Sequence, residues 1–177
     1  MYLSNMESEN FHDVDVLIRP ARKDDMVTVA SLIQELADFQ NMSDGPKMNA
    51  KDLQRDGFET TPPAFQLLVA ENKKNNAVIG YALYFTTYST WDGPAMMLED
   101  LYVKPALRKQ GIGRRLFNAV TKQAALARCS RLDFHVLEWN KAKSFYESIG
   151  AVNLTKTEQW CLYRLSGDAF QKTANQK

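Results

Sequence analysis

The chain has 177 residues, of which 45% are hydrophobic and 24% are charged, and its formal net charge is +1. This composition is typical of a globular protein with a sizeable core, and the balanced charge excludes a general attraction to nucleic acid or to an anionic membrane. Cys129 and Cys161 show neither a metal-ligand spacing nor a CxxC motif, which indicates thiols in a reducing compartment and no metal site.

The two ends of the chain are polar. Residues 1–13 contain no Lys or Arg and no apolar core of the kind that a secretory signal has. We expect them to form a flexible extension, and we expect residues 173–177 to form a polar tail. No apolar run approaches the ~20 residues needed to cross a bilayer. The protein is therefore expected to be cytoplasmic, with one folded domain over residues 14–172.

Strand and helix patterns alternate in the first half of the chain. β-branched residues over 14–20 predict a strand, and a pattern with one apolar face predicts a helix over 23–40. A short second helix is expected over 49–57. Three apolar segments joined by short turns then predict neighbouring antiparallel strands. These segments are 65–71, 78–89 and 96–105.

The second half of the chain continues the alternation. Apolar residues recur every three or four positions over 112–127, which predicts a helix, and a parallel crossover should join the strands before and after it. A helix over 139–150 is expected to begin with Asn140 as its cap. The remaining strands are expected over 131–137, 151–155 and 159–166. The predicted class is α/β (α+β), a mixed, mostly antiparallel sheet of about seven strands flanked by about four helices.

The segment RKQGIGRR, residues 108–115, lies between a strand pattern and a helix pattern. Such a turn can hold an anion, because the first amides of a helix lack partners and the helix dipole adds positive potential. Gly111 and Gly113 let a ligand approach the backbone closely. No Lys-Ser/Thr follows as in a P-loop, and Leu116 replaces the third glycine of a dinucleotide-binding motif. A plain turn with solvated cations is the alternative, but the Arg-x-x-Gly-x-Gly spacing favours a phosphate-bearing cofactor.

A carboxylate stands in the middle of the strand before this turn. In a regular strand Glu99 shares a face with Met97 and Leu101, and such apolar neighbours would suit its carboxyl to accepting a proton. A structural carboxylate bonded to nearby backbone is the alternative for Glu99. Asp100 points to the opposite face and is expected to be structural.

Seven segments of the chain together resemble the GNAT acetyltransferases. Within this superfamily they resemble the diamine (spermidine/spermine) N-acetyltransferase family, and they are most similar to its second branch, whose members resemble thialysine acetyltransferases. The segments are IRPA (18–21), LIQELADF (32–39), YSTWDG (88–93), LEDLYVKP (98–105), RKQGIG (108–113), EWN (138–140) and FYESIGA (145–151). The resemblance covers residues 16–170 and implies the GNAT fold, with a sheet splayed at the cofactor site. It also implies transfer of an acetyl group from acetyl-CoA to a primary amine of a small di- or polyamine or a thialysine-like amino acid, by direct attack in a ternary complex.

The resemblance implies where acetyl-CoA would bind. Its pyrophosphate would lie on the amides of the glycine turn, and its pantetheine arm would follow the preceding strand as an added strand does. The positions that match the family's cofactor site are Leu101, Tyr102, Val103, Arg108, Lys109, Gln110, Gly111, Ile112, Gly113, Arg114, Asn140, Lys141, Ala142 and Lys143. Lys109 stands where glycine is common, but the backbone N–H that a phosphate needs is kept.

Tyr146 matches the family's catalytic tyrosine and would donate a proton to the leaving thiolate, with Glu99 as the proton acceptor. Spacing alone would make Tyr146 a core residue. Neither cysteine lies in a motif, so no covalent intermediate is expected. The positions that match the amine site are Phe39, Gln40, Glu99, Asp133, Phe134, His135 and Glu158. Gln40 replaces an acid of the polyamine-specific members, which favours shorter diamines or thialysine-like substrates, and a structural role is the alternative for His135.

Two other functions stay open on the sequence. One is a CoA-binding module without catalysis that regulates a partner, although the presence of Glu99 and Tyr146 argues against it. The other is an acetyltransferase that acts on a protein N-terminus or lysine, which needs an open groove. The resemblance further implies a homodimer with a twofold axis near the active site.

Overall fold

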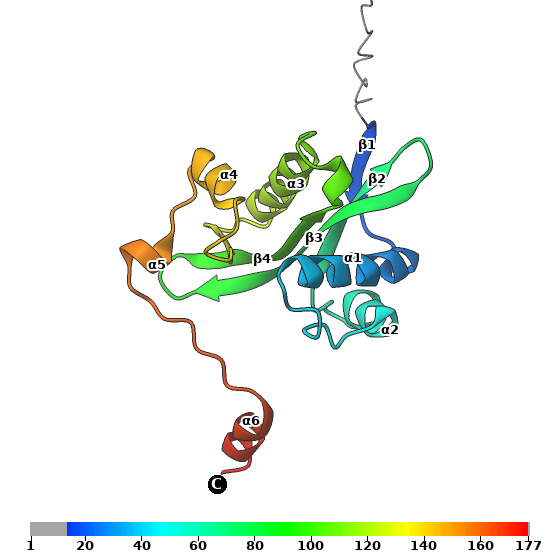
Figure 1. Ribbon diagram of the computed structural model, residues 1–177. Coiled ribbons are helices and arrows are strands. Elements are labelled where there is room, and N and C mark those ends of the chain that lie inside the picture. Colours follow the sequence, from blue (N-terminus) through cyan, green and yellow to red (C-terminus); the bar gives the residue numbers. More distant parts are fainter. Residues whose placement is uncertain (1–13, 177) are drawn as a thin grey trace, which may run out of the picture. The chain divides into compact units, whose positions relative to one another are not determined.

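A mixed sheet of five strands forms the centre of the first of two compact units, which ends at His135 (Figure 1). The computed structural model describes residues 14–176, so the extension expected over residues 1–13 lies outside the described residues. The strands follow the order β1-β2-β3-β4-β5. They are β1 (Val16–Pro20), β2 (Gln66–Asn72), β3 (Ala77–Ser89), β4 (Gly93–Val103) and β5 (Leu132–Phe134). The first four pair antiparallel and β5 pairs parallel to β4, which confirms the predicted neighbours and the crossover.

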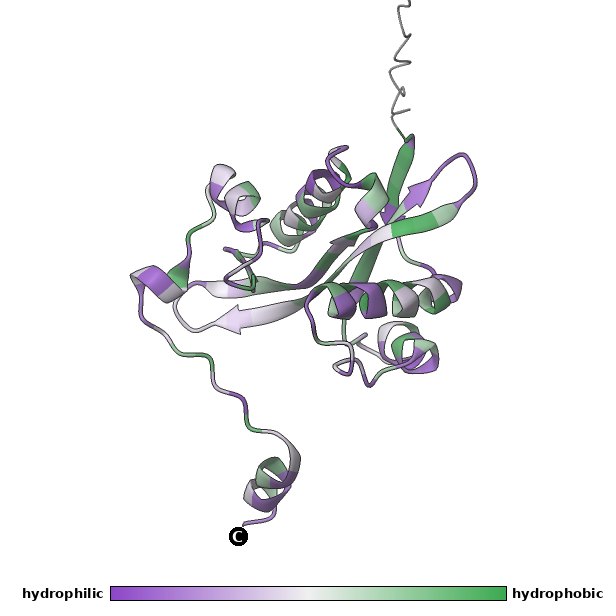
Figure 2. Cartoon of the chain, viewed as in Figure 1, coloured by the Kyte–Doolittle hydropathy of each residue, from purple (hydrophilic) through white to green (hydrophobic). Residues whose placement is uncertain are grey.

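Helices cover both faces of this sheet. Figure 1 shows α1 (Met26–Phe39) and α2 (Ala50–Gln54) on one face and α3 (Ile112–Leu126) on the other. Short helical turns precede α1 at Lys23–Asp25, follow α2 at Arg55–Glu59 and precede the glycine turn at Pro105–Leu107. Figure 2 shows hydrophobic and hydrophilic residues interleaved along α1 and α3, as expected of helices that bury one side.

The core between α1 and the sheet explains why these elements form. Met26, Val29 and Leu32 repeat at helical spacing on α1, and all three are buried. They pack in one cluster with strand residues that alternate along β2 and β3, among them Val69 and the completely buried Tyr81. The buried stripe of α3 covers the opposite face, as the periodicity predicts; it comprises Ile112, Leu116, Phe117, Val120 and Ala124.

The second unit begins at Val136 and consists of short helices joined by turns. They are α4 (Lys143–Ser148), α5 (Leu154–Thr157) and α6 (Gly167–Ala174). The predicted helix over 139–150 is therefore shorter than expected, and the predicted polar tail overlaps the end of α6. Across the described residues, no helix is long and apolar enough to span a bilayer.

The prediction of about seven strands is wrong for residues 14–176, in which the sheet has five. Residues 151–155 enter the helix α5, and residues 159–166 pair with no strand in the described part of the chain. The physical reason is that an alternating apolar pattern shows only that the side chains would suit a sheet. To form a strand, the segment also needs the backbone of a neighbouring strand to hydrogen-bond with.

Candidate active site

A β-bulge interrupts β4 at Glu99. Leu98 lies opposite Tyr84 of β3, whereas Asp100 lies opposite Leu83, so that Glu99 has no partner on β3. Beyond such an inserted residue the alternation of faces is reversed, and bulges often lie beside active sites, where they redirect a side chain.

The bulge overturns the prediction that Glu99 is buried on the face of Met97. Glu99 is exposed, and the carboxylate that β4 turns inward is Asp100. The hydroxyl of the buried Tyr81 donates a hydrogen bond of 3.0 Å to Oδ2 of Asp100. Burial raises the pKa of Asp100 above its usual value, the neighbouring Glu99 raises it further, and the bond from Tyr81 works in the opposite direction. Two adjacent carboxylates therefore have different environments.

One edge of β4 is open beyond the bulge. β5 pairs with β4 only at Met96, Met97 and Leu98, whereas β4 continues to Val103. Among residues 14–176, no strand pairs with Leu101–Val103 on that side. The resemblance implies a splayed sheet at the cofactor site, and an open strand edge can hydrogen-bond an extended ligand as an added strand would.

The glycine turn follows the end of this open edge. Gly111 has a φ of +75° and precedes α3, whose first helical hydrogen bond is donated by the amide of Arg115 to the carbonyl of Gly111 at 3.0 Å. The amides of Ile112 and Gly113 lie ahead of that bond and so have no acceptor within the helix. A Cβ placed on Gly111 would meet no atom within 4 Å, so the space beside the turn is open. This geometry fits a diphosphate, the anionic group of the implied cofactor.

Several side chains of the turn hold it to the sheet. The Nε of Arg108 donates to the carbonyl of Val103 at 2.9 Å, and Nη2 of Arg115 donates to the carbonyl of Val16 at 2.6 Å. The side-chain oxygen of Gln110 accepts from the amide of Val14 at 3.4 Å. Lys109, in the position where glycine is common, has a φ of +64°, which is rare for a residue with a side chain. Its side chain is exposed.

The predicted amine-site residues of the first unit lie in different settings. Phe39 ends α1 and Gln40 caps it. The carboxylate of Asp133 accepts from Nε of Arg131 at 2.9 Å, and the same arginine pairs with Asp92. The ring of Phe134 packs edge-on against Phe117 of α3, with ring centroids 5.6 Å apart. His135 is exposed, which does not support the structural alternative for it.

The second unit holds the other predicted site residues. The turn before α4 brings Asn140 and Ala142 together, since the side-chain oxygen of Asn140 accepts from the amide of Ala142 at 2.9 Å. Lys141 is exposed in this turn, and Nζ of Lys143 contacts Glu138 at 2.6 Å. Glu158 accepts from the indole N–H of Trp160 at 3.1 Å.

Tyr146 lies on α4 and is half-buried. Its ring lies 5.0 Å from that of Phe145, measured between centroids. Burial raises the pKa of Tyr146, so its hydroxyl is protonated at neutral pH and can donate a proton.

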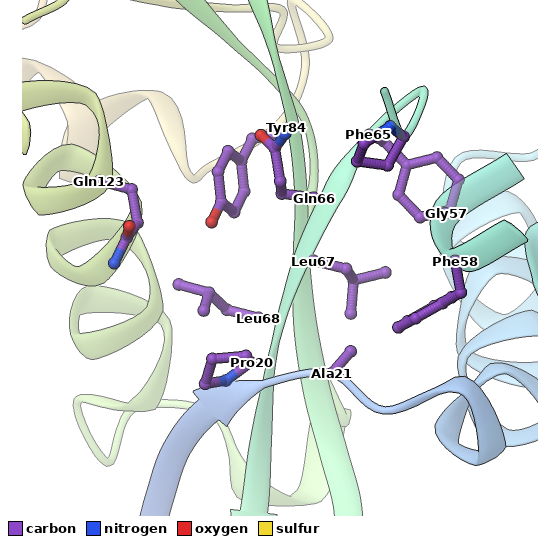
Figure 3. Close-up of a pocket in the computed structure, with 11 residues that line it drawn as sticks. Pro20, Ala21, Gly57, Phe58, Phe65, Gln66, Leu67, Leu68, Tyr84 and Gln123 are labelled. Carbon is purple, nitrogen blue, oxygen red and sulfur yellow. The ribbon is translucent and has the colours of Figure 1, made fainter. Parts of the chain in front are cut away.

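A pocket of about 220 Å³ lies elsewhere in the first unit (Figure 3). It opens where β1 ends, and its walls include Pro20, Phe58, Tyr84 and Gln123, which come from both sides of the sheet. None of the residues that line it belongs to the predicted site. The candidate active site is the open β4 edge with the glycine turn. Asp100 lies beside it, and the hydrogen bond from Tyr81 agrees with the structural role expected for this carboxylate. What the sequence did not reveal is the exposure of Glu99, because no local pattern marks the bulge.

A central mixed sheet, an open β4 edge and a glycine turn before a helix fit the GNAT acetyltransferase fold. Residues 29–151 match the acetyltransferase (GNAT) family, and the chain belongs to this family, whose members use acetyl-CoA. The predicted family and fold are thereby confirmed.

Relatives with a known activity are similar over nearly the whole chain. Thialysine N-epsilon-acetyltransferase of Bos taurus is 40% identical over 166 residues, which is 90% of this chain and 97% of the relative. The enzyme of that name from Mus musculus is 39% identical over 164 residues, or 89% and 96% of the two chains. An integron cassette protein from the mobile metagenome of V. cholerae superposes with a TM-score of 0.71 at 24% identity, over 91% of this chain and 98% of that one. This last likeness concerns the fold.

Proposed function

We propose that this enzyme acetylates a primary amine of a thialysine-like amino acid or a small di- or polyamine, by direct attack in a ternary complex with acetyl-CoA. The observation that carries the proposal is the open edge of β4. A short helical turn joins it to the start of α3, where the amides of Ile112 and Gly113 have no acceptor within the helix. The 40% identity to a thialysine N-epsilon-acetyltransferase over nearly the whole of both chains supports the amine class.

In this proposal the chain's backbone holds the acyl donor. The amides of residues 109–114 bind the diphosphate, and the backbone of Leu101–Val103 pairs with the pantetheine arm. The resemblance to the family implies that residues 140–143 also contact acetyl-CoA. Bound acetyl-CoA supplies the thioester that the amine attacks. Because the family match covers residues 29–151, which include parts of both units, we propose that residues 14–172 act as one acetyltransferase domain.

The amine must lose a proton before it can attack. An aliphatic ammonium with a pKa near ~10.4 costs about 4–5 kcal/mol to deprotonate at pH 7. We assign the acceptor role to Glu99, directly or through water, because the bulge turns its carboxylate away from the core beside the open edge of β4. Tyr146 then donates a proton to the thiolate that leaves.

Glu99→Gln is expected to move the pH–rate profile of kcat/KM toward alkaline pH and to lower the rate at pH 7 by about 10²-fold or more. Without the carboxylate, the reaction depends on the small population of free amine, which grows as the pH approaches the pKa of the amine. Asp100→Asn is the matched control, since it makes the same kind of change one residue further along β4. If the pH–rate profile shifted toward alkaline pH in Asp100→Asn but equalled that of the wild type in Glu99→Gln, the proton acceptor would be Asp100.

A panel of amines with acetyl-CoA tests the proposed substrate class. Thiol release is measured with thialysine, short diamines, spermidine, and peptides that offer an N-terminus or a lysine. We expect turnover with the small amines and none with the peptides. Turnover confined to peptides would assign the enzyme a protein acceptor. Binding of coenzyme A without turnover of any amine would make the protein a CoA-binding module.

We also propose that the enzyme is a cytoplasmic homodimer. Residues 159–166 carry an alternating apolar pattern without a strand partner within residues 14–176, and Trp160, Leu162 and Tyr163 are 67%, 76% and 90% exposed. A second copy could cover this surface. We expect light scattering to give a dimer mass for the wild type and a monomer mass for Leu162→Lys. A wild-type monomer mass at micromolar concentration would contradict the proposal.

A further inference from the structure

The guanidinium of Arg108 lies over two aromatic rings that come from different elements. Its central carbon is 4.9 Å from the ring centroid of Phe39, at the end of α1, and 5.4 Å from that of Tyr102, on β4. Both distances lie within the range of cation–π attraction. Arg108 is therefore held from two sides, by the helix that covers the sheet and by the strand that precedes the glycine turn.

A carboxylate on α1 holds the second ring. The hydroxyl of Tyr102 donates a hydrogen bond of 2.8 Å to Oε2 of Glu35, and Oε1 of Glu35 lies 3.6 Å from Nζ of Lys104. Burial and the bond to Glu35 raise the pKa of Tyr102 to about 12, although Arg108 works in the opposite direction. The hydroxyl therefore stays protonated at neutral pH, and the bond that fixes the ring persists. We call Glu35, Phe39, Tyr102 and Arg108 the Arg108 cluster.

The Arg108 cluster is connected to the glycine turn, because Arg108 is the first residue of that turn. The Nε of Arg108 donates to the carbonyl of Val103 at 2.9 Å, which ties the start of the turn to the end of β4. An unrestrained arginine side chain has many rotamers, and two ring contacts reduce this freedom before any ligand binds. The planar guanidinium is thus fixed at the start of the turn whose amides would hold a diphosphate.

We propose that Phe39 is a positioning residue for the acyl-donor site, and that it acts through Arg108. This inference rests on the proposed function, in which the turn over 109–114 holds the diphosphate. It differs from the prediction that Phe39 contacts the amine, because its ring lies against the arginine of the turn. The end of α1 thereby prepares the site that binds the co-substrate.

Calorimetric titration of coenzyme A into the enzyme without an amine tests the proposal. Phe39→Leu is expected to raise the Kd by about two- to fivefold, as the loss of a solvent-exposed cation–π contact implies. Phe39→Tyr keeps the aromatic face and is expected to restore the wild-type Kd. Phe58→Leu is the matched control, because Phe58 is 39% exposed, as Phe39 is, and lies at the pocket of Figure 3. Its Kd should equal that of the wild type.

A double-mutant cycle separates positioning from a general loss of stability. In an Arg108→Gln background the arginine charge is absent, so Phe39→Leu should no longer change the Kd. If Phe39→Leu raised the Kd equally in both backgrounds, or changed only the KM of the amine, the proposal would be wrong. If the wild type itself bound no coenzyme A, the proposed function would fail first and this inference with it.

Discussion

Tyr146→Phe is expected to lower kcat by about 10²- to 10⁴-fold, the usual contribution of a general acid. The substitution removes one hydroxyl and keeps the ring on α4, so the Kd of coenzyme A should change little. Because burial raises the pKa of Tyr146, the acid form persists through neutral pH and is lost only when the pH rises above the usual tyrosine value of about 10. The measurement is a steady-state pH profile of kcat beside calorimetry.

Tyr84→Phe provides the control for this prediction. Burial also raises the pKa of Tyr84, and this residue lines the pocket of Figure 3 rather than the candidate active site. Its kcat should equal that of the wild type. A wild-type kcat in Tyr146→Phe would remove the assigned role of this hydroxyl.

Gly111→Ala is expected to weaken coenzyme A binding by about 100-fold, which corresponds to the loss of about two charge-assisted hydrogen bonds. At a φ of +75° an alanine is strained by about 1–2 kcal/mol, so that the turn relaxes and its amides no longer converge. Its Cβ would also occupy the open space through which a diphosphate reaches the backbone. Calorimetry with coenzyme A measures the loss.

Gly93→Ala is the matched control for Gly111→Ala. Gly93 has a φ of +86°, and a Cβ there would likewise meet no atom within 4 Å, but it is the first residue of β4, at the far end of that strand from the glycine turn. Both variants should lose similar stability in thermal unfolding, while only Gly111→Ala loses affinity. Equal coenzyme A affinities in the two variants would show that the glycine turn does not hold the ligand.

Much of the fold could be predicted from local patterns. The apolar stripe of α3, the three consecutive strands β2, β3 and β4, and the glycine turn lie where the sequence places them, within a few residues. These features are readable because the period of apolar residues and the φ preference of glycine act within a few residues of the chain. The same local motifs carry the resemblance to the family, which the match over residues 29–151 confirms.

The sequence by itself thus determined the order of elements from β1 to α3, the position of the glycine turn and the family. The tertiary structure alone decided which carboxylate of β4 faces the core, where the strand edge opens, and that Phe39 lies against Arg108. Each of these features depends on a partner that is distant in the chain. The bulge at Glu99, for example, is defined by the register of β4 against β3. In the same way, residues 159–166 form no strand because no strand pairs with them within residues 14–176. Local preferences specify what a segment can become, whereas pairing and packing specify which side chains meet.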